Sequence, residues 1–197
     1  MIDAIYNRRS IRKYKTDPIP QEDILAILES GLKAPSSKNR QPWKYVVIQG
    51  QSKKEMLDVF RRGIEREEHM TALLPESKMH IKAAKYTVDI MENTPVIVFV
   101  VNTQGSGLSE QMTPEEHIYE ICNVQSISAS IQNMLLTATE RGIGSLWICD
   151  IYFAYEELCQ WLGDEGQLLA AIAFGYPDEQ PNARPRKALD EVVEWRN

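Results

Sequence analysis

The chain has 197 residues, 43% of them hydrophobic and 25% charged, which is the balance of one soluble globular domain with a large core. Its formal net charge of −6 argues against a nucleic acid as the main partner, because an acidic surface repels phosphate backbones. The longest apolar run, 95–101, is far shorter than the ~20 residues that span a bilayer, so we expect no membrane partner.

The first part of the chain predicts two helices and a strand. Residues 2–8 are typical of a short helix, and 17–20 predict a turn because two of the four residues are proline. Apolar residues recur at helical spacing along 20–33, and they are Ile24, Leu25, Ile27, Leu28 and Leu32. After a polar connection, 45–48 predict a strand.

The next segment is helical in pattern and heavily charged. Ser52 and Glu55 have the spacing of a capping box, so we expect a helix to begin there and to continue beyond Ile64. Residues 70–91 predict a loop around Pro75 and a further helix. We predict that 61–92 forms a lid or side excursion.

The middle of the chain predicts a central strand and a very long helix. Residues 95–101 are a continuous β-branched run, typical of a buried strand. Thr113 and Pro114 open a helix that nothing interrupts before Gly142, which is long against a mean of about 11–12 residues. Its expected apolar contacts are Ile118, Ile121, Ile127, Ile131, Met134, Leu135 and Ala138. Its small residues, which would let a helix or a flat ligand approach, are Ser126, Ser128, Ala129 and Ser130.

The last part predicts two further strands and an extended tail. Residues 143–148 and 168–176 read as strands, with a short helix over 155–162 between them. The tail, 178–197, is first proline-rich and basic, then acidic, and carries little apolar surface. We expect it to be an arm that lies across something else. No repeat or domain boundary divides the chain, so we expect a single domain over 1–197.

The connection 35–43 concentrates hydrogen-bonding side chains. It reads Pro35-Ser36-Ser37-Lys38-Asn39-Arg40-Gln41-Pro42-Trp43. The two prolines prevent a helix or strand from passing through it easily. Composition favours an ordinary polar loop anchored by its tryptophan, and a site for a polar ligand is the alternative.

Two arginine clusters lie at opposite ends of the chain. Arg8, Arg9 and Arg12 surround Ser10, and Arg184 and Arg186 lie in the tail. Arginine presents planar donors that match phosphate oxygens, although for either cluster alone solvated surface charge is the favoured explanation. No glycine-rich phosphate loop is present, and Gly142-Ile143-Gly144 precedes a strand instead of following one.

The cysteines and histidines show no metal-ligand or paired spacing. An odd number of cysteines without a secretion signal predicts reduced thiols in a cytoplasmic protein. We therefore expect no metal site.

Five motifs together resemble the nitroreductase family of FMN-dependent oxidoreductases. They occur in the order of the family and extend over most of the chain. The motifs are Arg8-Arg9-Ser10-Ile11-Arg12-Lys13-Tyr14, residues 35–43, Gln132-Asn133-Met134-Leu135-Leu136, Gly142-Ile143-Gly144-Ser145-Leu146-Trp147 and Pro185-Arg186-Lys187. The resemblance implies an α+β fold with a central, mostly antiparallel sheet flanked by helices. It also implies an intertwined homodimer with two FMN sites at the interface, each drawing on both chains.

The resemblance also implies roles for particular residues. Arg8 and Ser10, with Arg9 in the same motif, would hold the FMN phosphate from one end of the chain. Arg186 and Arg184 would hold it from the other end. The side chains expected at the pyrimidine edge and ribityl chain are those of Ser36, Ser37 and Asn39.

The ring itself would lie near Arg12 and the end of the fourth motif. A cation at Arg12 would stabilise the negative charge that builds up at N1 and the C2 carbonyl during reduction. Backbone N–H groups of Cys149, Asp150 and Ile151 would face N5 and O4. Many relatives have glycine where this chain has Cys149-Asp150, and the Asp150 carboxylate would either disfavour the reduced anion or point away.

The resemblance implies a ping-pong reaction. NADH or NADPH would reduce FMN, and a small-molecule acceptor such as a nitroaromatic or a quinone would then take the electrons. No catalytic side chain is needed, because the cofactor carries the chemistry. The alternatives are another flavin reaction (dehalogenation, enone reduction, dehydrogenation or flavin breakdown) and a non-enzymatic flavin-binding protein.

Overall fold

The computed structural model describes residues 2–108, 111–163 and 166–196. The α-helices of this part are α1 (Asp3–Asn7), α2 (Gln21–Leu32), α3 (Gly50–His69), α4 (Ile81–Glu92), α5 (Pro114–Glu140) and α6 (Tyr155–Leu162). The strands are β1 (Trp43–Ile48), β2 (Val96–Asn102), β3 (Gly144–Ile148) and β4 (Gln167–Gly175). Short 3₁₀ turns are η1 (Ser37–Asn39), η2 (Pro75–His80), η3 (Asp150–Ala154) and η4 (Leu189–Glu191).

The four strands form one antiparallel sheet in the order β1-β2-β4-β3. β2 lies in the interior of the sheet and all its residues are buried, as its β-branched run predicts. Its side chains alternate between the two faces. Val98 packs in the cluster with α2 and α5, whereas Phe99 packs in the cluster with α3, α4 and α6. The predicted α+β fold with a mostly antiparallel sheet is therefore confirmed.

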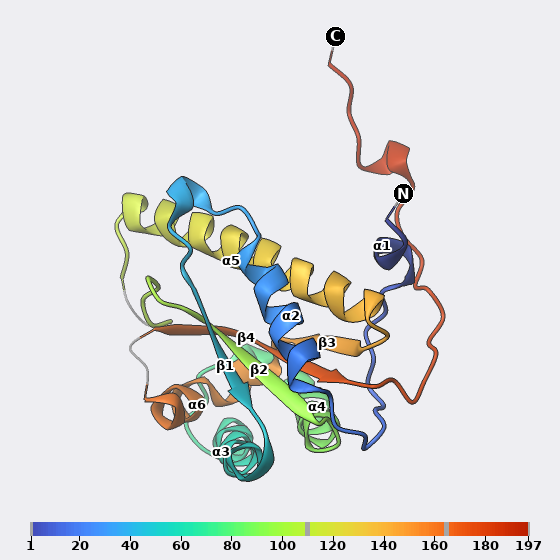
Figure 1. Ribbon diagram of the computed structural model, residues 1–197. Helices are drawn as coiled ribbons and strands as arrows, with labels where there is room; N and C mark the ends of the chain where they lie inside the picture. Colours follow the sequence, from blue (N-terminus) through green and yellow to red (C-terminus); the bar gives the residue numbers. More distant parts are fainter. Residues whose placement is uncertain (1, 109–110, 164–165, 197) are drawn as a thin grey trace.

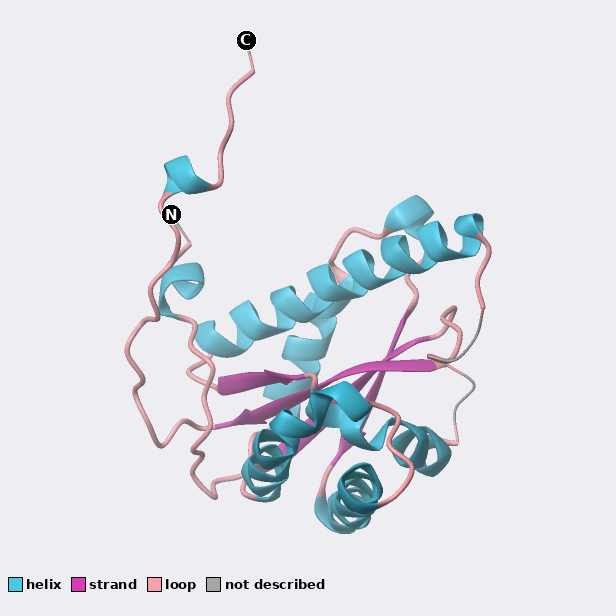
Figure 2. Cartoon of the chain, turned by 180° about the vertical axis from the view of Figure 1, so that it is seen from behind, coloured by secondary structure: helices cyan, strands magenta, loops and turns pink. Residues whose placement is uncertain are grey.

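The helices form one layer on each face of the sheet. α5 and α2 cover one face, and α3, α4 and α6 cover the other (Figures 1 and 2). None of the helices in the described part of the chain combines the length and the apolar character needed to cross a bilayer.

The predicted start of α5 is confirmed in detail. Thr113 accepts a hydrogen bond from the Glu116 backbone N–H, and the Glu116 carboxylate accepts one from the Thr113 N–H at 2.7 Å. Gly142 follows the helix with φ +70°, a conformation that L side chains rarely adopt. The small residues of α5 also act as expected, because a Cβ on Gly31 of α2 would lie 2.9 Å from Ser130 Oγ.

One detail of the helix predictions was wrong. The helix expected to start with the Ser52–Glu55 capping box begins earlier, at Gly50, and its N-cap Gln49 makes no side-chain capping bond. Ile118 and Ile121 of α5, expected to make apolar contacts on a helix that could lie at a subunit interface, are 57% and 44% exposed within one chain, so those contacts stay a prediction. The first turns of α5 lie beside the η1 loop (Figure 1), whose Lys38 and Arg40 contact Tyr119 between these two isoleucines.

The segment 61–92 contains the end of α3, η2 and α4. Ile64, Val88 and Met91 lie in the core beneath the sheet. Glu67, although only 1% exposed, accepts hydrogen bonds from the backbone N–H groups of Leu73 and Leu74 at 2.7 and 3.0 Å. The connection after α3 is thus fixed to the helix, and the lid function expected of this segment stays a prediction.

The C-terminal arm leaves the sheet after β4, passes α1 and ends away from the body of the chain (Figures 1 and 2). Several of its apolar side chains are exposed, and they are Leu189, Val192, Val193 and Trp195.

Candidate functional site

The two ends of the chain meet at one cavity. It has a volume of about 710 Å³, and the polar side chains that line it include Arg8, Arg9, Ser10, Arg12, Arg184 and Arg186. We call this the arginine cavity. The two arginine clusters that the sequence separates by more than 170 positions therefore lie together.

The N-terminal side of the arginine cavity is positioned by the edge of the sheet. The Ile11 N–H donates to the Ser145 carbonyl of β3 at 3.0 Å, and Ser10 forms a parallel bridge with Ser145. The Tyr14 hydroxyl donates to the Ile11 carbonyl at 2.7 Å. The tail is attached to the same segment through the Asp178 N–H, which donates to Lys13 at 2.9 Å. The extended segment after α1 thus holds both clusters at the start of β3.

The arginine cavity is lined by several cations, and none of the described residues that line it is acidic, although Glu179 lies next to it and accepts a hydrogen bond from the Arg12 backbone N–H. Burial lowers the pKa of Arg8, and the nearby guanidinium groups of Arg186 and Arg9 lower it further. Among the described residues, no carboxylate lies within ion-pair distance of Arg8, Arg184 or Arg186. Cations that repel one another without a partner are suited to binding an anion such as a phosphate.

An unsatisfied hydroxyl lies on β3, in the residue that forms the backbone bridge with Ser10. Ser145 is 2% exposed, and its Oγ has no hydrogen-bond partner among the described residues. A buried polar atom without a partner carries a desolvation cost that a bound ligand can remove. Ser145 was not among the predicted site residues, because a serine inside a predicted strand gives no signal of this kind.

β3 is an edge strand that carries the next group of predicted residues. The Ser145 carbonyl points outward to Ile11, so by alternation the backbone groups of Trp147 also face the open edge, whereas Cys149 lies beyond the strand and its carbonyl accepts a hydrogen bond from the Tyr152 N–H at 3.2 Å. Cys149 is exposed as a residue. The pKa of its thiol is raised, mainly because the sulfur is partly desolvated and to a smaller extent because the Asp150 carboxylate is near. The end of β3 therefore offers backbone donors to a ligand at the edge.

The side chains after Cys149 point away from that edge. The Asp150 carboxylate accepts a hydrogen bond from the Thr87 hydroxyl of α4 at 2.5 Å. Ile151 is fully buried in the cluster beneath the sheet. Of the two alternatives for Asp150, the structure shows the one in which the carboxylate is turned toward the helical layer.

The 35–43 loop is rigidly held. Its backbone has positive φ at Lys38, Asn39 and Gln41, which are the only described non-glycine residues in that conformation. The Ser37 N–H donates to Ser126 Oγ of α5 at 3.1 Å, and the Gln41 N–H donates to Ser36 Oγ at 3.1 Å. Strained backbone that neighbouring contacts maintain is frequent at ligand sites.

The loop and the arginine cavity lie toward opposite ends of α5 (Figure 1). Arg40 of the loop lies over Tyr119, whereas Arg9 lines a cavity together with Thr139. Tyr119 and Thr139 are 20 residues apart on α5, which corresponds to about 30 Å at a rise of 1.5 Å per residue. A single chain therefore brings the predicted residues together in two groups, not in one site.

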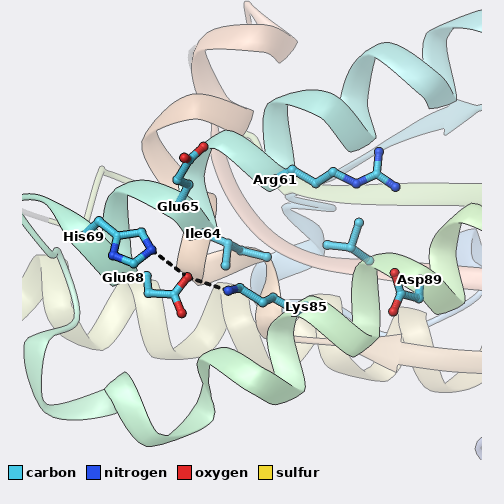
Figure 3. Close-up of a pocket in the computed structure, with 8 residues that line it drawn as sticks. Arg61, Ile64, Glu65, Glu68, His69, Lys85 and Asp89 are labelled. Atoms are coloured by element: carbon cyan, nitrogen blue, oxygen red, sulfur yellow. Dashed lines mark hydrogen bonds and ion pairs between the residues drawn. The ribbon is translucent and has the colours of Figure 1, made fainter.

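A further cavity of about 410 Å³ lies between α3 and α4 (Figure 3). Its cations already have partners, since Lys85 pairs with Glu68 at 2.5 Å and Arg61 pairs with Glu92 outside the cavity at 2.9 Å. It therefore offers no free charge to a phosphate, and the arginine cavity remains the candidate anion site.

Comparisons with known proteins show which family this chain belongs to. The Nitroreductase family model matches residues 5–176. A putative NAD(P)H nitroreductase from Haemophilus influenzae is 28% identical, over 99% of this chain and 96% of that protein. A 5,6-dimethylbenzimidazole synthase from Rhodospirillum rubrum is 27% identical, over 91% of this chain and 83% of that protein.

A solved structure shows the same arrangement of elements. A putative nitroreductase from Desulfovibrio desulfuricans, in complex with FMN, has a TM-score of 0.71 and 26% identity, covering 99% of this chain and 95% of that one. Since the family model covers most of the sequence, this chain belongs to the Nitroreductase family.

Proposed function

We propose that the protein is an FMN-dependent oxidoreductase that takes electrons from NADH or NADPH and passes them to nitroaromatics, quinones or related acceptors. The observation that carries the proposal is the arginine cavity, because it joins the motifs at both chain ends around unpaired cations. Bound FMN would supply the hydride and electron transfer.

The arginine cavity fits the phosphate end of FMN. Arg8 and Arg186 would neutralise the dianion, and Ser10 would add a hydroxyl donor. A phosphate there would also relieve the repulsion that lowers the pKa of Arg8.

The edge of β3 fits the ring end. Backbone N–H groups of Cys149 and its neighbours, directly after this edge strand, would donate to the N5 and O4 positions. Arg12 lines the same cavity and would place positive charge where the reduced ring becomes negative. With no acid or base required from the protein, donor and acceptor would use one face of the ring in turn, in a ping-pong sequence.

We further propose that the site is completed by a second copy of the chain. Ser36, Ser37 and Asn39 lie too far along α5 to reach a ligand in the arginine cavity of their own chain. Exposed apolar side chains support a partner surface, and they are Leu25, Leu32, Ile118, Ile121, Leu189 and Trp195. An intertwined homodimer would cover them and would bring the loop of one chain to the arginines of the other.

The absorbance spectrum of the purified protein tests the proposal. We expect a yellow protein that bleaches when NADH or NADPH is added without oxygen. Arg186→Gln should lose FMN, while Arg196→Gln, which removes the same charge from a residue paired with Glu194, should keep it. A colourless protein that takes up no added FMN would contradict the proposal.

A second candidate is another flavin reaction. It is favoured by the synthase from Rhodospirillum rubrum, which shows that family membership does not determine the reaction. In that case the protein would hold FMN, but nicotinamides would reduce it slowly or not at all. Rapid turnover of quinones or nitro compounds with NADH or NADPH would exclude this candidate.

A further inference from the structure

A third cavity lies beside the 35–43 loop at the beginning of α5. Its volume is about 290 Å³, and its lining includes Arg40, Gln104, Ser106, Tyr119, Glu120 and Asn123. We call it the Tyr119 cavity. It differs from the arginine cavity in combining an aromatic ring, a single lining cation and a buried amide.

The cations at this cavity are unpaired. The guanidinium carbon of Arg40 lies 4.3 Å from the centroid of the Tyr119 ring, and the ammonium of Lys38 lies 5.7 Å from it. Neither cation has a carboxylate within ion-pair distance among the residues that the structure describes. Stacking on tyrosine orients the guanidinium and leaves its N–H donors available for an anion.

The nearby carboxylates are already engaged elsewhere. Glu116 accepts hydrogen bonds from the backbone N–H and the hydroxyl of Thr113, at 2.7 and 2.9 Å. Glu120 accepts one from Gln167 Nε2 at 2.7 Å. Both carboxylates are oriented by neutral donors, and among the described residues neither forms an ion pair with Arg40.

Asn123 provides an independent indication of a ligand. Its side chain is buried, since the residue is 2% exposed, and its Oδ1 has no hydrogen-bond partner within the described structure. A buried carbonyl oxygen without a donor costs free energy, and an O–H or N–H of a ligand in the cavity would restore it.

We propose that the Tyr119 cavity is a specificity site for a small aromatic molecule that bears an anionic group and a hydrogen-bond donor. The anionic group pairs with Arg40, and the ring packs against Tyr119. A hydroxyl or amino group of the ligand donates to Asn123 Oδ1. The volume lies just below the ~300 Å³ lower limit of drug-sized pockets, so it suits a single substituted ring.

The inference rests on the proposed function, because Lys38 and Arg40 alternate with the loop residues assigned to the flavin edge. A ligand held by Arg40 would therefore lie beside the loop that is proposed to hold the flavin. The inference predicts that the protein prefers negatively charged aromatic acceptors to neutral ones.

Calorimetric titration of the full-length protein, with and without FMN, tests the charge. The probes are 4-hydroxybenzoate and its methyl ester, which keep the same ring and hydroxyl but differ in the negative charge and in one methyl group. We expect the acid to bind about tenfold more tightly than the ester, and Arg40→Gln to bring this ratio close to one. Lys33→Gln removes an exposed cation outside the cavity and should leave the ratio within twofold. Equal binding of acid and ester by the unaltered protein would overturn the proposal.

Benzoate tests the donor without any change to the protein. Because it lacks the hydroxyl, it should bind several-fold more weakly than 4-hydroxybenzoate, and Asn123→Leu should abolish this difference. The ligand comparison holds even if that variant fails to fold. Equal binding of benzoate and 4-hydroxybenzoate would remove Asn123 from the site and overturn the donor requirement.

The anion that Arg40 binds could instead be a phosphate of the dinucleotide, and a comparison of NADPH binding with NADH binding tests this alternative. If Arg40→Gln weakens NADPH binding selectively and leaves the acid-to-ester ratio unchanged, the cation serves a dinucleotide phosphate and the proposal is overturned. A protein that holds no FMN but discriminates acid from ester would contradict the proposed function alone. A yellow protein without this discrimination would contradict the inference alone.

Discussion

The arginine cavity and the α3–α4–α6 face use the same charged residue types in opposite ways. On the helical face, Arg66 pairs with Glu157 at 2.5 Å, and the buried Glu67 is satisfied by Arg66 and two backbone donors. In the arginine cavity, Arg8 and Arg186 repel one another and have no described carboxylate partner. Paired charges hold elements together, whereas unpaired ones lower stability until a ligand arrives. The difference separates residues that maintain the fold from residues available for binding.

The largest effect is expected from the arginine cavity. Replacing Arg8 and Arg186 together with glutamine should weaken FMN binding about a hundredfold, because two charge-assisted hydrogen bonds to phosphate are lost. The FMN-free variant should be as stable as the unaltered protein or slightly more stable, since the repulsion is gone. Fluorescence titration with FMN and thermal unfolding without it measure the two quantities. A destabilised FMN-free variant would assign these arginines to the fold.

The opposite result is expected on the helical face. Glu67→Gln should lower the free energy of unfolding by about 2 kcal/mol, because a buried carboxylate with three hydrogen bonds loses its charge. FMN affinity of the folded protein should not change. Urea denaturation provides the measurement. Glu68→Gln is the matched control, since its carboxylate is more exposed and should matter little. Equal effects of the two variants would show that the buried network is not structural.

The 35–43 loop gives a smaller effect that separates side chain from backbone. Asn39→Gly keeps the positive φ accessible and should weaken FMN binding about fivefold, through loss of the side chain alone. Asn39→Ala should add a stability loss of about 1 kcal/mol, because alanine disfavours this conformation. FMN titration and urea denaturation measure both variants. Unchanged FMN affinity in both would make the loop a simple connection.

The smallest effect is a pH dependence on the paired face. Burial alone would raise the pKa of Glu157, but its hydrogen bonds to Arg66 bring the pKa below the ordinary glutamate value. This stabilisation is present above the unfolded pKa and is lost as pH falls through the lower folded pKa. Thermal unfolding between pH 3 and pH 7 (a range chosen around a pKa of about 4.3) should therefore show a steeper acid loss for the unaltered protein than for Glu157→Gln. Parallel curves would exclude this contribution.

Local patterns predicted most of the fold. The β-branched run became the buried β2, and the Thr113 cap and Gly142 bounded α5 to within a residue. The predicted helix start at Ser52 was wrong, since α3 begins at Gly50. A capping-box pattern marks one possible first turn, and the packing of the surrounding chain decides which first turn forms. The exposed Ile118 shows a limit of such patterns, since helical spacing does not reveal what an apolar side chain packs against.

The sequence by itself determined the elements, the family and the residue types suited to a phosphate, because hydrophobic periodicity, caps and motifs are local properties. Only the tertiary structure decided which of those residues meet. It brought Arg8 close to Arg186, turned the Asp150 carboxylate toward Thr87, and placed the Tyr119 ring beneath the Arg40 guanidinium. It also separated the loop from the arginine cavity along α5. These outcomes depend on long-range packing across both faces of the sheet, which no local pattern encodes.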